Sequence, residues 1–176
     1  MKTKNIKQKI KEFFLENPTK KLRVRQIERG VGVPLPSAIR YAKELVSERI
    51  LRQENISDIK LFSANSESPE YLLEKRLYNL RALHLSGLIE YLIQEYSNPV
   101  IILFGSYSKG EDIETSDIDL YVETPSKKII DLKKIESKLS RKIQLFIHKN
   151  IKNISNPHLA NNILNGIVLS GSIEVF

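Results

Sequence analysis

The first third of the chain alternates between apolar positions at helical spacing and polar turns. Apolar side chains recur three or four residues apart over residues 6–14, and Asn17-Pro18 ends that run. The next apolar-periodic stretch, residues 24–30, is short and ends at Gly30. This pattern predicts two helices before residue 31.

A third helix and a hairpin are predicted next. Over residues 37–50, Ser37 offers an N-cap, and the apolar residues repeat at helical spacing. The predicted core face of this helix consists of Ile39, Ala42, Leu45 and Val46. Residues 50–54 and 58–63 are short alternating runs on either side of a polar turn, which predicts a β-hairpin.

The middle of the chain predicts a linker and a long helix. Residues 63–69 are polar and end at a proline, as is typical of a linker. Residues 70–96 then follow a helical pattern, with Ser86-Gly87 as the expected break. Its leucines are expected to pack internally or to form a homodimer interface; they are Leu73, Leu77, Leu80, Leu88 and Leu92.

The last part alternates strands and helices, which predicts a small mixed β-sheet flanked by helices. The expected strands are residues 100–105, 117–123 and 142–148, and the expected helices are residues 127–142 and 157–166. The fold class is therefore α+β. We expect an N-terminal domain over residues 1–63, a connecting segment over 64–97 and a second domain over 98–176.

Charge is divided unevenly between these parts. The net charge is +7, yet residues 1–62 hold 15 of the 28 lysines and arginines and only 7 of the 21 acidic residues. The basic excess therefore lies entirely in the first third, which favours contact with a polyanion there. No stretch approaches the roughly 20 apolar residues that span a bilayer, so we expect a cytoplasmic protein with no membrane partner.

The order helix, helix, helix, hairpin over residues 5–63 resembles a winged helix-turn-helix domain. In that family the third helix enters the DNA major groove and the hairpin contacts the backbone. The resemblance implies DNA contacts from the third helix and the hairpin, namely from Ser37, Arg40, Tyr41, Lys43, Arg52 and Lys60. The alternative is that this domain contacts only protein, for example as a dimerisation module.

The stretch with the most chemistry is "ILFGSYSKGEDIETSDIDLYVE", residues 102–123. Gly105-Ser106 follows an apolar strand and opens a short helical turn, an arrangement that lets phosphate approach the backbone closely. Asp117 and Asp119 lie two residues apart in a strand, so both carboxylates share one face with Cα atoms about 6.6 Å apart. With no cysteine in the chain, oxygen ligands of this kind select Mg²⁺ or Mn²⁺.

The combination Gly-Ser-x10-Asp-x-Asp, with "GSYSKG" and "SDIDL", resembles the signature of the DNA-polymerase-β-like nucleotidyltransferase superfamily, particularly its minimal members. The resemblance covers roughly residues 80–170. It implies that Gly105 and Ser106 bind the tail of a nucleoside triphosphate, ATP being the expected one, and that Asp117 and Asp119 ligate Mg²⁺. The enzyme would transfer a nucleoside monophosphate to an acceptor. Further nucleotide contacts are expected from Lys109 and Ser116.

One position departs from the family's pattern. Active members bring a third carboxylate from a later strand, and the expected position is occupied here by Gln144, a neutral and weaker ligand. Three functions stay open. They are a nucleotidyltransferase acting on a protein, an RNA or a small molecule; a DNA-binding regulator that binds nucleotide without turnover; and a DNA-binding protein whose second domain is a scaffold. For the first, the resemblance also suggests a helical toxin-type protein partner.

Overall fold

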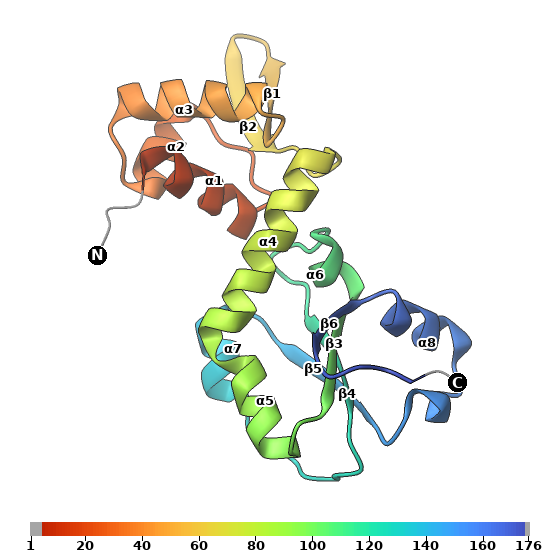
Figure 1. Ribbon diagram of the computed structural model, residues 1–176. Helices are drawn as coiled ribbons and strands as arrows, with labels where there is room; N and C mark the ends of the chain where they lie inside the picture. Colours follow the sequence, from red (N-terminus) through yellow and green to blue (C-terminus); the bar gives the residue numbers. More distant parts are fainter. Residues whose placement is uncertain (1–4, 175–176) are drawn as a thin grey trace. The chain divides into compact units, whose positions relative to one another are not determined.

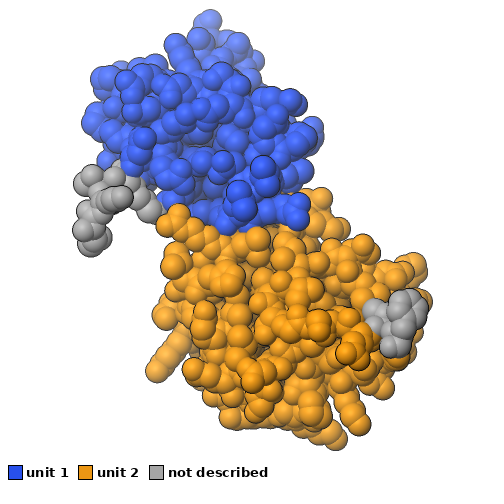
Figure 2. All heavy atoms as spheres, in the orientation of Figure 1, with its two compact units in different colours: residues 1–78 blue, residues 79–176 orange. Residues whose placement is uncertain are grey.

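The chain folds into two compact units. The computed structural model describes residues 5–174, and the units comprise residues 1–78 and 79–176 (Figures 1 and 2). Helix α4 (Pro69–Ser86) contributes its first half to the first unit and its second half to the second. The connecting segment that we expected over residues 64–97 is thus divided between the two units.

Before α4, the described residues of the first unit form three helices and a two-stranded hairpin, in the order that the sequence predicts. They are α1 (Ile6–Glu16), α2 (Val24–Val31), α3 (Leu35–Ser47), β1 (Leu51–Ile56) and β2 (Ile59–Ala64). The strands pair antiparallel, with Ile56 opposite Ile59 beside the turn. An isolated bridge between Leu22 and Phe62 joins the segment before α2 to the hairpin.

The core of the first unit forms where α1 packs against α3. Ala38 and Ala42 of α3 are fully buried in the same apolar cluster as Ile10 and Phe14 of α1. Small side chains on α3 let the two helices approach closely, while each large buried side chain stabilises the fold by about 1.5–3 kcal/mol. Tyr71, at the start of α4, belongs to the same cluster.

Two details of α3 correct the sequence prediction. The helix has Pro34 as its N-cap residue, so Ser37 lies inside the first turn and its predicted role as the cap is wrong. Pro36 fits this turn because the first helical N–H groups have no partner within the helix. The buried stripe starts at Ala38, and Ile39, which we predicted to face the core, is 40% exposed.

The ends of two other helices also differ from the prediction. Helix α2 continues past Gly30 and ends at Gly32, which has a φ of 68° and donates its N–H to the carbonyl of Glu28. Helix α7 spans Lys133–Leu139 and is much shorter than the predicted helix over residues 127–142. Asp131 accepts a hydrogen bond from the backbone N–H of Lys133 at the start of α7.

The second unit is built on a mixed sheet flanked by helices, as predicted. Its elements are the second half of α4, α5 (Leu88–Tyr96), β3 (Val100–Phe104), α6 (Gly105–Lys109), β4 (Ile118–Glu123), α7, β5 (Ile143–His148), the 3₁₀ turn η1 (Ile151–Asn153), α8 (Pro157–Leu164) and β6 (Ile167–Ser170). The strand order is β5-β4-β3-β6. Strands β4 and β5 are parallel and the other pairs are antiparallel. Strand β6 was not predicted.

The long helical pattern breaks where expected, because Gly87 between α4 and α5 has a φ of 81°. Leu88 and Leu92 of α5 are fully buried. Leu73 and Leu77 of α4 are 57% and 54% exposed, so the prediction that they pack internally is wrong. Another face of the helix is buried there, since Tyr71 and Lys75 are each 1% exposed.

Each face of the sheet has its own apolar cluster. One face, with Ile118, Leu120 and Val122 of β4, packs against α5 and α7; the other, with Tyr121, packs against η1 and α8 (Figure 1). Asp119 alternates onto the Tyr121 face. Because it lies near the start of β4, it is only half-buried. No helix within residues 5–174 is long and apolar enough to cross a membrane.

Candidate active site

The junction of β3 and α6 brings a glycine against a carboxylate. Gly105 follows Phe104, the last residue of β3, and has a φ of 72°. A Cβ atom on residue 105 would overlap Oδ2 of Asp119 and would lie 3.3 Å from its Cγ. Glycine is therefore required here both by the backbone conformation and by the close approach of Asp119.

The two motif aspartates differ in exposure. Asp117 is exposed immediately before β4, whereas Asp119 is half-buried within the strand, opposite Phe104. Partial burial, together with the negative charge of Asp117, raises the pKa of Asp119 above its ordinary value. Both causes disfavour the ionised form, and a bound cation would oppose both of them. The pair is thus an oxygen donor set suited to a divalent cation.

Gln144 lies directly beside Asp119. The two residues are partners in the parallel register of β4 and β5, and the Gln144 side chain is exposed. Within residues 5–174, no group of three histidines, cysteines or acidic residues is close enough together to hold a metal ion. The position next to Asp119 in the sheet therefore offers a neutral amide.

Two other polar residues of these strands lie farther along. Glu123 pairs with His148 at the far end of β4 and β5. Its Oε2 accepts hydrogen bonds from the Tyr121 hydroxyl and the Ile151 N–H, both at 2.8 Å. The His148 ring stacks on Tyr121 with centroids 6.1 Å apart. These contacts give Glu123 and His148 structural partners away from Asp119.

The remaining residues of the motif lie on α6 and in the loop that follows. Ser106 is half-buried in the first turn of α6, and Lys109 is exposed in the last. Ser116 closes the loop locally, because its hydroxyl accepts a hydrogen bond from the Ile113 N–H at 3.0 Å. Its own N–H donates to the Ile113 carbonyl, also at 3.0 Å.

A buried polar cluster beside this loop was missed by sequence reasoning. Asp112 is 1% exposed and accepts a 2.7 Å hydrogen bond from Nδ2 of Asn79. Nη2 of Arg141 lies 3.8 Å from the other carboxylate oxygen of Asp112. The three residues come from α4, the loop and the segment before β5. No local sequence pattern relates positions so far apart in the chain.

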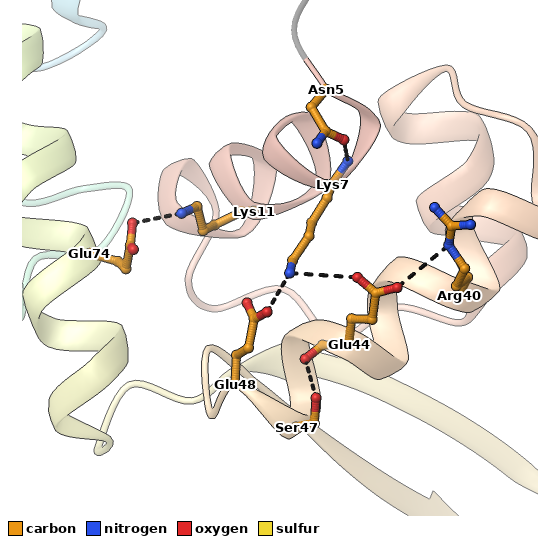
Figure 3. Close-up of polar contacts among 8 residues, drawn as sticks. All are labelled: Asn5, Lys7, Lys11, Arg40, Glu44, Ser47, Glu48 and Glu74. Carbon is orange, nitrogen blue, oxygen red and sulfur yellow. Dashed lines mark hydrogen bonds and ion pairs between the residues drawn. The ribbon is translucent and has the colours of Figure 1, made fainter.

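In the first unit, two candidate DNA contacts on α3, Arg40 and Tyr41, have partners within the protein. The guanidinium of Arg40 lies 4.3 Å from the centroid of the Tyr41 ring and forms an ion pair with Glu44 at 3.5 Å. Figure 3 shows Glu44 shared with Lys7, which also contacts Glu48. Hydrogen bonding to Glu48, more than attraction to either glutamate, raises the pKa of Lys7.

The other candidate contacts differ in exposure. Ser37 and Tyr41 are half-buried, and Lys43 is exposed. On the hairpin, Lys60 is exposed, whereas Arg52 forms an ion pair with Glu54 at 3.3 Å. All four cations of the expected set are thus exposed, and two of them, Arg40 and Arg52, form ion pairs within the protein.

Lys43 and Lys60 line a groove of about 490 Å³ between α2, α3 and the hairpin. Its apolar and charged lining consists of Arg23, Val24, Arg25, Ile39, Lys43, Asp58, Ile59, Lys60 and Phe62. Arg23 and Arg25 were not among the predicted DNA contacts. Their position just before and within α2 gave no signal in the sequence beyond their charge.

Comparison with known proteins finds a similarity for most of the second unit. Residues 85–170 match the family model described as nucleotidyltransferase domain, which covers the turn at Gly105 and both motif aspartates. The match spans just under half of the chain. No curated protein matches the sequence. Most of the second unit is thus similar to a nucleotidyltransferase domain, as the motif predicts. That similarity supports a transferase with a nucleoside triphosphate substrate.

Proposed function

We propose that the second unit transfers a nucleoside monophosphate from a nucleoside triphosphate to an acceptor, with a divalent cation held by Asp117 and Asp119. The observation that carries this proposal is the packing of Gly105 against the Asp119 carboxylate. It brings the expected phosphate-binding turn against Asp119, one of the two expected metal ligands. Phosphoryl-type transfer depends mainly on such positioning and on neutralising phosphate charge.

The residues present fit Mg²⁺ or Mn²⁺. Asp117 and Asp119 supply the carboxylate oxygens, and glycine at position 105 leaves the Asp119 carboxylate free of a side chain that would press on it. The cation would neutralise triphosphate charge as it develops. Gly105 lets the phosphates approach the backbone, and the Ser106 hydroxyl hydrogen-bonds to phosphate. Lys109 at the end of α6 and Ser116 in the loop that follows also contact the nucleotide.

A second candidate function is nucleotide binding without turnover. The register pairing of Asp119 with Gln144 favours it, because a neutral amide is a poor base and a weaker metal ligand than a carboxylate. In this alternative Asp117 and Asp119 still bind the metal–nucleotide complex, and the domain acts as a sensor. The two candidates predict the same binding and differ only in label transfer.

For the first unit we propose DNA binding, with α3 and the hairpin as the contacting elements, as in a winged helix-turn-helix. The basic excess of residues 1–62 and the basic groove support it. We assign Lys43 and Lys60 to phosphate contact and add Arg23 and Arg25. Base contacts from α3 and a helical toxin-type partner rest on the resemblance, and a homodimer rests on the resemblance and on the leucines of residues 70–96.

The proposed transfer is tested with each labelled nucleoside triphosphate and Mg²⁺, with and without cell lysate. Asp117→Asn/Asp119→Asn is compared with the control Glu90→Gln/Asp131→Asn, which also removes two carboxylates from the second unit. Transfer by wild type and control, but not by the motif variant, establishes the enzyme. Nucleotide-dependent stabilisation without transfer supports the sensor. If wild type shows neither stabilisation nor transfer, both candidate functions are ruled out.

A further inference from the structure

The loop between α6 and β4 determines where Asp117 lies. Residues 110–117 contain no helix or strand, so the loop depends on individual contacts for its conformation. At its start, the N–H of Glu111 donates to the Ser106 carbonyl at 3.0 Å. Near its end, Ser116 and Ile113 exchange the two hydrogen bonds described above. The middle of the loop is held by two side chains from other segments, those of Asn79 and Arg141.

Asn79 holds the loop from the side of α4. Its Nδ2 donates to Asp112 at 2.7 Å and to the Tyr107 carbonyl at 2.9 Å. Tyr107 belongs to α6, which also contains Ser106. One buried amide therefore connects the expected phosphate-binding turn to the loop that leads to the expected metal ligands.

Arg141 holds the loop from the side of β5. Besides its 3.8 Å contact with Asp112, its Nη1 donates to the backbone carbonyl of Glu114. The backbone carbonyl of the next residue, Lys142, accepts a 2.8 Å hydrogen bond from the N–H of Ile118, at the start of β4. The guanidinium thus contacts two points of the loop that leads to Asp117, and its rigid, planar set of donors suits two separate acceptors better than a lysine ammonium does.

A charged pair this buried is an inefficient means of stabilisation. The Asp112 side chain has no exposed surface and that of Arg141 is 12% exposed. Removing two charges from water costs several kcal/mol per ion, and well-packed apolar residues often replace such pairs without loss of stability. The pair does fix geometry, since each partner must keep its charge satisfied.

We propose that Asn79, Asp112 and Arg141 form a buried clasp that positions the nucleotide site, holding Asp117 and Asp119 at a fixed distance from Gly105 and Ser106. The clasp residues touch neither nucleotide nor metal, so they are positioning residues. The inference rests on the proposed function of the second unit. A displacement of about 1 Å in such a site can cost about 100-fold in rate.

The test measures the rise in melting temperature of the full chain with each nucleoside triphosphate and Mg²⁺, from which apparent affinity is obtained. Three variants are compared with wild type: Arg141→Lys, Asp112→Asn, and the double variant Asp112→Asn/Arg141→Gln. The control is Lys142→Gln, which removes an exposed cation one residue away. Where label transfer is measurable, kcat and KM are determined as well.

We expect at least tenfold weaker nucleotide affinity, or at least tenfold lower kcat, in all three clasp variants, and values within twofold of wild type in the control. The double variant leaves no unpaired buried charge. It should therefore melt closer to wild type than Asp112→Asn, which leaves the Arg141 charge unpaired, while its nucleotide affinity or kcat stays low. That separation of stability from function distinguishes a positioning role from a purely structural one.

Three results would overturn the inference. If the double variant recovers both melting temperature and nucleotide affinity, or if all variants bind and react as wild type does, the clasp only stabilises the fold and the proposed function stands. If wild type itself shows neither nucleotide binding nor transfer, the proposed function fails first, and the positioning role fails with it.

Discussion

Gln144 and Asp119 are direct neighbours across the parallel pairing of β4 and β5. A carboxylate at position 144 would place a second acid beside the half-buried Asp119, next to the exposed Asp117. The side chain at position 144 therefore decides whether two or three acidic groups meet near the starts of β4 and β5.

Gln144→Glu is expected to increase the effect of Mg²⁺ on the melting temperature. Without a divalent cation the added charge repels Asp119 and lowers the melting temperature, because like charges disfavour each other. With Mg²⁺ the melting temperature should rise more than in wild type, and any label transfer should increase. The matched control is Gln94→Glu, at an exposed position on α5. The same Mg²⁺ response in both variants would argue against a cation beside residue 144.

Gly105→Ala should destabilise the second unit more than Gly87→Ala. Both positions have positive φ, 72° and 81°, so each alanine incurs a backbone cost of about 1–2 kcal/mol. Only at residue 105 does the new Cβ meet Asp119; at Gly87 nothing lies within 4 Å. The excess should be about 1–3 kcal/mol in denaturant unfolding. It should shrink in Gly105→Ala/Asp119→Ala; an equal excess in that double variant would contradict the close approach of Asp119.

Removing cations from the groove of the first unit should weaken DNA binding and its salt dependence. In Lys43→Gln/Lys60→Gln and in Arg23→Gln/Arg25→Gln, the slope of log affinity against log salt should fall by about one for each cation that no longer pairs with a phosphate. Fluorescence anisotropy of a labelled duplex between about 50 and 500 mM salt measures it. Lys127→Gln/Lys149→Gln in the second unit makes the same change in net charge and should leave the slope unchanged.

The pH dependence of stability should include a contribution from Glu136. Its carboxylate accepts hydrogen bonds from the Ile143 N–H at 3.0 Å and from Lys142 at 3.2 Å. The first of these, more than the second, lowers the pKa of Glu136 below its ordinary value of 4.5. The resulting stabilisation is fully present above pH 4.5, the ordinary pKa. It is lost as the pH falls through the lower pKa that Glu136 has in the folded protein.

Glu136→Gln should therefore reduce the fall in melting temperature on acidification from about pH 6 to about pH 3. Glu90→Gln, at an exposed position on α5, serves as the control and should keep the wild-type profile. If Glu136→Gln and wild type lose stability in parallel, the hydrogen bond from Ile143 does not favour the ionised carboxylate.

The sequence predicts well those structural features that depend on the local spacing of apolar and turn residues. The three helices and the hairpin of the first unit, the break at Gly87 and the strand with Asp119 all follow from periodicity and turn residues. Ile39 was misplaced because a helical wheel cannot tell which side a neighbouring helix covers. The small Ala38, one residue earlier, gives a closer fit.

The sequence does not predict the clasp, for a different reason. Asn79 and Arg141 lie 33 residues before and 27 residues after their partners Asp112 and Glu114, and each is an ordinary polar residue in its own segment. Strand β6 escaped prediction because residues 167–170 are a short apolar run near the end of the sequence, with little period to read. Such features depend on long-range packing, which no window of the sequence contains.

Helix α4 limits how this chain can be cut into pieces. In the first unit, Glu74 pairs with Lys11 at 2.8 Å (Figure 3), and the buried Lys75 donates to the Leu15 carbonyl at 2.6 Å. Four residues later, Asn79 holds the loop of the second unit. A fragment ending before α4 lacks groups that hold the end of α1, and one starting after it lacks the amide that holds the loop. For protein engineering, the two units therefore cannot be separated at either end of α4 without loss, since one short stretch of this helix carries residues that each unit needs.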